Sequence, residues 1–117
     1  MPNVLHDKSF AFALRIVNLY TFLTDDKKEY VLSKQVLRSG TSIGANIREG
    51  RNAQSSLDFV NKYSIALKEA DETQYWIELL YAAKLIDKKA YESLNNDINE
   101  IIALLTSSIK TAKNNGK

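Results

Sequence analysis

The sequence predicts an all-α fold, an antiparallel up-down-up-down bundle of four helices. Pro2 is the only proline, so no residue after it forbids a helix. Apolar residues recur at steps of three and four along the chain rather than in alternation, which is typical of helices. Four such segments joined by short connections favour antiparallel neighbours. We therefore expect a single domain over residues 1–117, with an ordered core over about residues 7–113.

The first helical segment is apolar over most of its surface. One stripe passes through Phe10, Ala13, Leu14, Val17 and Tyr20. Further apolar residues widen this stripe, namely Phe12, Ile16, Leu19 and Leu23. A face this wide exceeds that of a surface helix, so we expect the first helix to be largely enclosed. Thr24, Asp25 and Asp26 then indicate a turn and the cap of the next helix.

The three later helices show narrower apolar stripes. The second carries Leu32, Val36, Ile43 and Ile47 and ends near Gly50. The third is expected to begin at Ser55 and Asp58, whose spacing resembles a capping box, and to end near Lys84. Asp87 is placed to cap the fourth helix, whose stripe is Tyr91, Leu94, Ile98, Ile101, Leu105, Ser108 and Ala112. The core predicted from these stripes contains Phe10, Val17, Ile43, Ile47, Tyr63, Ile77, Leu94, Ile98 and Leu105.

Composition excludes several classes of protein. The 117 residues include no cysteine and one histidine, which excludes a disulfide scaffold and cysteine-ligated zinc. His6 has no partner ligand or nucleophile beside it, so we predict no metal site, no catalytic residue and no cofactor. No apolar run approaches the ~18 residues of a membrane span, and no basic segment followed by an apolar one is found near residue 1, so we expect neither a membrane span nor a signal peptide. We expect a cytoplasmic protein that is not an enzyme and does not contact membranes.

The net charge of +2 is too small to indicate nucleic-acid binding by itself. Its distribution is uneven, because residues 1–52 carry a net charge of +3, residues 53–100 one of −4, and residues 101–117 one of +3. Ordinary solvated helix faces explain such a distribution.

The segment Arg38–Arg51 is rich in serine, glycine and threonine, which are mediocre or poor helix formers. On a helix, Arg38, Ser42, Asn46 and Glu49 form one polar stripe. Two interpretations follow. Gly40 and Gly44 admit a bulky neighbour such as Trp76 from the third helix, or the stripe lies in a subunit interface where an Arg–Asn–Glu network fixes the register. The pattern alone favours neither.

Two other groups of residues are candidates for contacts with partners. Tyr75 and Trp76 are adjacent on the third helix, so at least one of them leaves the core face, and such aromatics are enriched at protein–protein contacts. A protein partner is therefore one possibility. Basic residues that could touch the phosphates of RNA or DNA are Arg15, Arg48, Arg51, Lys110 and Lys113. That signal is weak, because no aromatic residues are interleaved for base stacking.

Two separated motifs resemble a known family. The run Arg38-Ser39, Ser42-Ile43, Ala45-Asn46-Ile47 and Glu49-Gly50 resembles the signature of the 23S rRNA intervening-sequence four-helix-bundle proteins, and residues 65–80 are similar to the third helix of that family. Gly40 and Thr41 depart from it, since the family more often has Ala or Val there.

The resemblance implies a small bacterial four-helix bundle whose biochemical role is largely unassigned. A related branch, the accessory variability protein of diversity-generating retroelements, forms a basic pentameric barrel that binds reverse transcriptase and nucleic acid. By analogy we expect a ring-shaped homo-oligomer of five subunits here, with the stripe of Arg38, Ser42, Asn46 and Glu49 at the subunit interface. The leading prediction is a non-enzymatic homo-oligomeric scaffold or adaptor. The alternative is an RNA- or DNA-binding protein.

Overall fold

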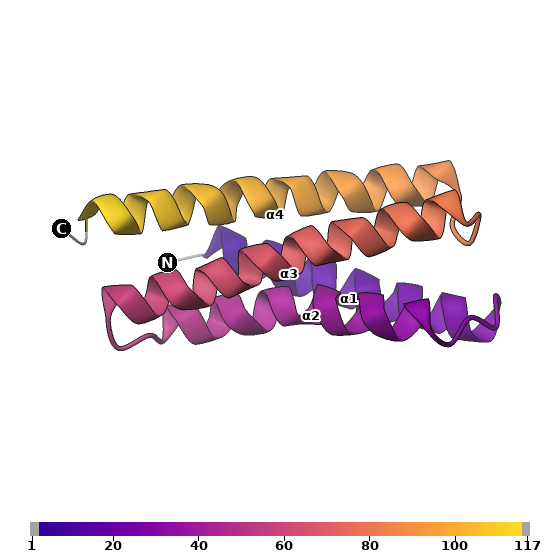
Figure 1. Ribbon diagram of the computed structural model, residues 1–117, viewed down its shortest axis with the longest axis horizontal. Helices are drawn as coiled ribbons and strands as arrows, with labels where there is room; N and C mark the ends of the chain where they lie inside the picture. The colour runs from indigo at the N-terminus through magenta and orange to yellow at the C-terminus, as the bar shows by residue number, and fades with distance from the viewer. Residues whose placement is uncertain (1–2, 116–117) are drawn as a thin grey trace.

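The computed structural model describes residues 3–115, which contain four helices and no strand, and this confirms the all-α class. The helices are α1 (Val4–Asp25), α2 (Leu32–Arg51), α3 (Ser56–Ala82) and α4 (Lys88–Asn115). They lie side by side along the long axis of a molecule measuring 49 × 23 × 21 Å (Figure 1). α1 and α3 begin at the end of the molecule where α2 and α4 finish (Figure 1). α2 packs against α1 and α3, α4 packs against α3, and the contact between α1 and α4 is much the smallest.

Side chains cap the helices where polar residues precede them. The side chain of Ser55 accepts a hydrogen bond from the backbone N–H of Asp58 at 3.1 Å, as the sequence predicts. The carboxylate of Asp87 accepts from the N–H of Ala90 at 2.8 Å, which confirms the predicted cap of α4. Asn3 caps α1 in the same way.

The cap predicted for α2 at Thr24 to Asp26 is wrong. Asp25 is the last residue of α1, and the start of α2 is capped by Glu29. One carboxylate oxygen of Glu29 accepts from the backbone N–H groups of Val31 and Leu32 at 3.1 and 2.9 Å, and the other accepts from Ser33 at 2.7 Å. Three of the unpaired N–H groups at this helix start are thereby satisfied by one side chain.

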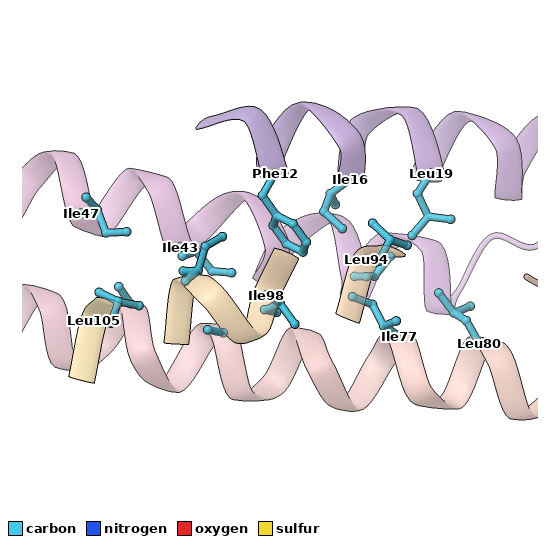
Figure 2. Close-up of a cluster of buried hydrophobic side chains, with 14 of the residues drawn as sticks. Phe12, Ile16, Leu19, Ile43, Ile47, Ile77, Leu80, Leu94, Ile98 and Leu105 are labelled. Carbon is cyan, nitrogen blue, oxygen red and sulfur yellow. The ribbon is translucent and has the colours of Figure 1, made fainter. Parts of the chain in front are cut away.

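The core lies along the axis between the four helices (Figure 2). Most of the predicted core residues are buried, namely Ile43, Ile47, Tyr63, Ile77, Leu94, Ile98 and Leu105. Phe10 and Val17 are not, because their side chains are 58% and 42% exposed. The core face of α1 instead consists of Leu5, Phe12, Ile16, Leu19 and Leu23.

The expectation that α1 is largely enclosed is therefore wrong for a single chain. Both apolar stripes of α1 have helical spacing, and spacing does not reveal which of two such stripes turns toward the other helices. The three helices packed around the axis cover one side of α1 only, so Leu14 is left 57% exposed.

The small residues of α2 lie against α1, not against Trp76 of α3. A Cβ added to Gly40 would lie 2.8 Å from Cγ1 of Ile16, and one added to Gly44 would lie 3.4 Å from Oγ of Ser9. The prediction that these glycines make room for a bulky side chain therefore names the wrong residue, because Trp76 does not lie over them. They let the backbone of α2 approach α1 closely, and Ile16 fills the space over Gly40.

Alanine substitutions at the two glycines should have opposite effects on stability. An alanine gains roughly 0.5–1 kcal/mol of helix propensity over glycine. At Gly44 the new methyl group meets only ordinary contacts, so Gly44→Ala should raise the free energy of unfolding by about that amount. At Gly40 it meets the stiff, buried Ile16, and overpacking of about 1–3 kcal/mol outweighs the gain. Urea denaturation measures both changes, and equal shifts in one direction would contradict this packing.

Glu29 should give α2 a cap that depends on pH. Burial would raise the pKa of its carboxyl, but the hydrogen bonds from Leu32, Ser33 and Val31 prevail and lower that pKa below its ordinary value of 4.5. A lowered pKa means that the stabilisation is fully present above the ordinary value and is lost as the pH falls through the folded value. We expect Glu29→Gln to cost about 1 kcal/mol at neutral pH and less in strong acid. A cost that grows as the pH falls would contradict the cap.

Candidate interaction surfaces

The polar stripe of α2 pairs with α3 of the same chain at both of its ends. One guanidinium nitrogen of Arg38 lies 3.2 Å from the carboxylate of Glu69, and the other donates to the carboxylate of Glu72. At the opposite end, the ammonium of Lys62 lies 2.9 Å from the carboxylate of Glu49. The hydrogen bond to Glu49 and its negative charge raise the pKa of Lys62. These pairs link the two ends of the stripe to α3.

The middle of the stripe bonds within α2. The hydroxyl of Ser42 donates to the backbone carbonyl of Arg38 at 2.7 Å, and the side-chain amide of Asn46 donates to the carbonyl of Ser42 at 2.9 Å. Both side chains are half-buried. The hydrogen bonds that these groups need are therefore met inside one chain, and the contact of the stripe with another subunit stays a prediction.

The aromatic pair of α3 is linked to the stripe through Glu72. The indole N–H of Trp76 donates to the same carboxylate oxygen that accepts from Arg38, at 3.0 Å. Tyr75 meets Trp76 edge to face, with ring centroids 5.1 Å apart, and its side chain is 56% exposed. Trp76 is half-buried, so of the two aromatic residues Tyr75 is the one that points away from the bundle.

A buried pair of hydroxyl groups between α2 and α3 was not predicted from the sequence. The hydroxyl oxygens of Ser39 and Thr73 lie 2.9 Å apart, and that of Thr73 lies 2.7 Å from the carbonyl of Glu69. Since a hydroxyl has one proton, Thr73 donates to the carbonyl and accepts from Ser39. Both residues are fully buried, so this bond fixes the pairing of the two helices.

The predicted basic residues form two separate groups. Arg15 lies 2.6 Å from the carboxylate of Asp97 and therefore joins α1 to α4. Arg48 and Arg51 are in the last turn of α2, Lys113 is in the last turn of α4, and Lys110 lies one turn before the end of α4. These helix ends lie at the same end of the molecule, although α2 and α4 do not contact each other (Figure 1). The negative end of each helix dipole favours cations at such positions.

An open, mainly apolar groove lies between the second half of α1, the end of α3 and the start of α4, and the sequence did not predict it. Its volume is about 790 Å³, and its apolar lining includes Leu19, Phe22, Tyr81, Ile86 and Leu94. The charged residues of its lining are Arg15, Lys27, Lys84 and Asp87.

The outer stripe of α1 is a second surface that sequence reasoning missed. Phe10, Leu14 and Val17 are 58%, 57% and 42% exposed. A hollow of about 380 Å³ lies beside Phe10, between α1 and α2, and its walls include Ala13, Thr41 and Ala45. The signal that could have revealed this surface was the width of the apolar face of α1, which exceeds what three neighbouring helices can cover.

Residues 3–115 contain no group of three or more His, Cys, Asp or Glu side chains placed to hold a metal ion. Of the four described helices, none is both long enough and apolar enough to cross a membrane.

Comparison with known proteins supports the fold and the motifs. A family model described as 23S rRNA-intervening sequence protein matches residues 3–107. The chain is 63% identical to a protein from Bacteroides thetaiotaomicron whose crystal structure is described as that of a protein with unknown function from the S23 ribosomal protein family. The two structures superpose with a TM-score of 0.91, over 92% of this chain and 96% of the other. No curated protein matches the chain.

Proposed function

The chain belongs to the 23S rRNA-intervening sequence protein family, and from that premise we propose that it acts as a non-enzymatic homo-oligomeric scaffold or adaptor. In this proposal the subunit is an antiparallel up-down-up-down bundle and the assembly is a ring, for which the family resemblance implies five copies. The link to the accessory variability protein of diversity-generating retroelements is part of the proposal.

The exposed apolar stripe of α1 is the observation that carries the proposal. Single exposed apolar side chains are common on protein surfaces, but contiguous ones mark interaction sites. Phe10, Leu14 and Val17 are each more than 40% exposed and follow one another at steps of four and three. Association would remove this apolar area from water, which is the main driving force of most protein assemblies.

The polar stripe and the aromatic pair extend this proposal to the face of α2 and α3. The side chain of Arg38 is half exposed although it pairs with two carboxylates, and Tyr75 is exposed beside it. Arginine and tyrosine are enriched in interfaces. We propose that Ser42, Asn46 and Glu49 hold Arg38 and its helix in the register that a neighbouring subunit contacts.

The alternative is binding of RNA or DNA by the basic end of the molecule. The observation that favours it is the position of Arg48, Arg51, Lys110 and Lys113 near two helix ends at the same end of the molecule (Figure 1). Each phosphate contact should steepen the loss of affinity with salt by about one log unit per log unit. Arg15 does not belong to this group, because it pairs with Asp97.

Native mass spectrometry of the full chain, purified without nuclease and at low salt, tests both functions. The scaffold predicts a discrete multiple of the 13.2 kDa subunit mass, with no additional mass. Mass that nuclease removes would place the nucleic-acid alternative first. A monomer alone, at every protein concentration tested, would contradict the scaffold.

A further inference from the structure

α1 carries two apolar faces, and the chain buries one of them. Phe12, Ile16 and Leu19 point into the core (Figure 2), whereas the outer stripe of Phe10 and Leu14 points to solvent. A helix that is apolar on all sides is characteristic of an enclosed position. The composition of α1 therefore fits a helix covered on both sides, and the single chain supplies the cover for only one side.

α2 extends the outer stripe into a broader patch. Thr41 and Ala45 are four residues apart on α2 and line the hollow beside Phe10. We call Phe10, Leu14, Val17, Thr41 and Ala45 the α1–α2 strip. Lys34 and Arg48 lie on the same outward side of α2, seven residues before Thr41 and seven after it. Asp7 of α1 is exposed three residues before Phe10, and Glu49, which also lines the hollow, is paired with Lys62. The border of the strip therefore carries a small net positive charge.

A surface with a small net negative charge lies on α3. Asp71, Tyr75 and Glu78 are exposed and follow one another at steps of four and three, and we call them the α3 face. Lys68 is exposed three residues before Asp71 on the same side of the helix, so its positive charge offsets one of the two carboxylates. Neither carboxylate has an ion-pair partner within 4.0 Å among residues 3–115. The helices that carry the two surfaces also differ in net charge. Residues 1–52, which include α1 and α2, carry a net charge of +3, and residues 53–100, which include α3, carry a net charge of −4.

We propose that the α1–α2 strip of one copy docks on the α3 face of a second copy. The proposal rests on the homo-oligomeric function and names the contact through which it forms. If the strips of two copies packed against each other, the positively charged Lys34 and Arg48 of both copies would lie close together and repel. If the strip packs on the α3 face, Lys34 and Arg48 instead approach the carboxylates of Asp71 and Glu78. The exposed ring of Tyr75 supplies an aromatic anchor for the apolar strip.

This contact joins two different surfaces, and its geometry therefore repeats from copy to copy. A docked pair still presents one free strip, on one copy, and one free α3 face, on the other, so the same contact can add another copy. Such head-to-tail contacts give rings where the rotation closes and filaments where it does not. A strip-to-strip contact would stop at a dimer.

The first test introduces a charge into the strip and compares it with a matched change on the same helix. Leu14→Glu should raise the dissociation constant of the assembly roughly 30-fold or more, since it buries an unpaired charge in the contact. Val4→Glu is the control, because Val4 is 55% exposed and lies outside the strip. Both variants should keep the helical circular dichroism spectrum of the unmodified chain, because both side chains are already exposed.

The second test asks whether the contact is head-to-tail. Tyr75→Glu removes the aromatic anchor, places a charge opposite the apolar strip and should also prevent self-association. A mixture of Leu14→Glu and Tyr75→Glu chains should form a 1:1 complex of twice the 13.2 kDa subunit mass, since an intact strip and an intact α3 face meet once and the two glutamates repel each other in the second contact. Size-exclusion chromatography with light scattering measures this mass. A Tyr75→Glu chain that dimerises alone would overturn the head-to-tail contact.

The failure of this proposal is distinguishable from failure of the oligomeric function. An unmodified chain that stays monomeric contradicts both. If the unmodified chain and the Leu14→Glu variant assemble equally well, the proposed scaffold function is retained and the proposed contact is overturned. Equal losses for Leu14→Glu and Val4→Glu would also overturn it, because the effect would then not depend on the strip.

Discussion

The position of α1 depends on Gly40 of α2. Gly40 has no side chain, and Ile16 of α1 packs directly over it. A Cβ there would approach Ile16 to 2.8 Å, so the two helices pack more closely than side chains of ordinary size would allow. Gly44 continues the approach one turn later against Ser9. α1 makes a much smaller contact with α4 than with α2, and an apolar groove lies between the second half of α1, the end of α3 and the start of α4. The stripe of poor helix formers in α2 is thus explained inside the subunit.

The contact of α2 with α3 is built differently, from polar groups. A buried hydroxyl pair, Ser39 with Thr73, lies among apolar core residues, and ion pairs of Arg38 and Glu49 flank it at the surface. Exposed ion pairs add little to stability, whereas a buried hydrogen bond is costly to break, so the register of α2 on α3 depends mainly on Ser39 and Thr73. α2 therefore packs closely on two neighbours. α1 packs closely on α2, is joined to α4 by the ion pairs of Arg15 with Asp97 and of Lys8 with Glu100, and exposes apolar residues on its outer side.

Much of the fold could be predicted from the sequence. The four helices, the caps at Ser55 and Asp87 and most of the core follow from local spacing and from hydrogen bonds between residues three apart. The orientation of α1 could not be predicted from the sequence, because its two apolar stripes are equally regular. The close packing of Ile16 on Gly40 places the stripe that contains Ile16 in the core, and this contact is visible only in the structure. The cap of α2 was assigned to the wrong residues because a glutamate three residues before a helix is a less common cap than Asp or Thr. For the candidate surfaces, the polar stripe and the aromatic pair were visible as patterns, but their ion pairs and the outer stripe of α1 required the tertiary structure.

Disulfide trapping tests most directly whether α3 of another copy covers the exposed side of α1. The chain has no cysteine, so introduced thiols have no competing partners. We predict that a chain carrying both Leu14→Cys and Tyr75→Cys forms a ladder of covalent oligomers on oxidation, ending at the size of the ring, while each single variant stays uncrosslinked. Covalent dimers of the Leu14→Cys variant alone would contradict the account, as would a double variant that assembles like the unmodified chain without any crosslink.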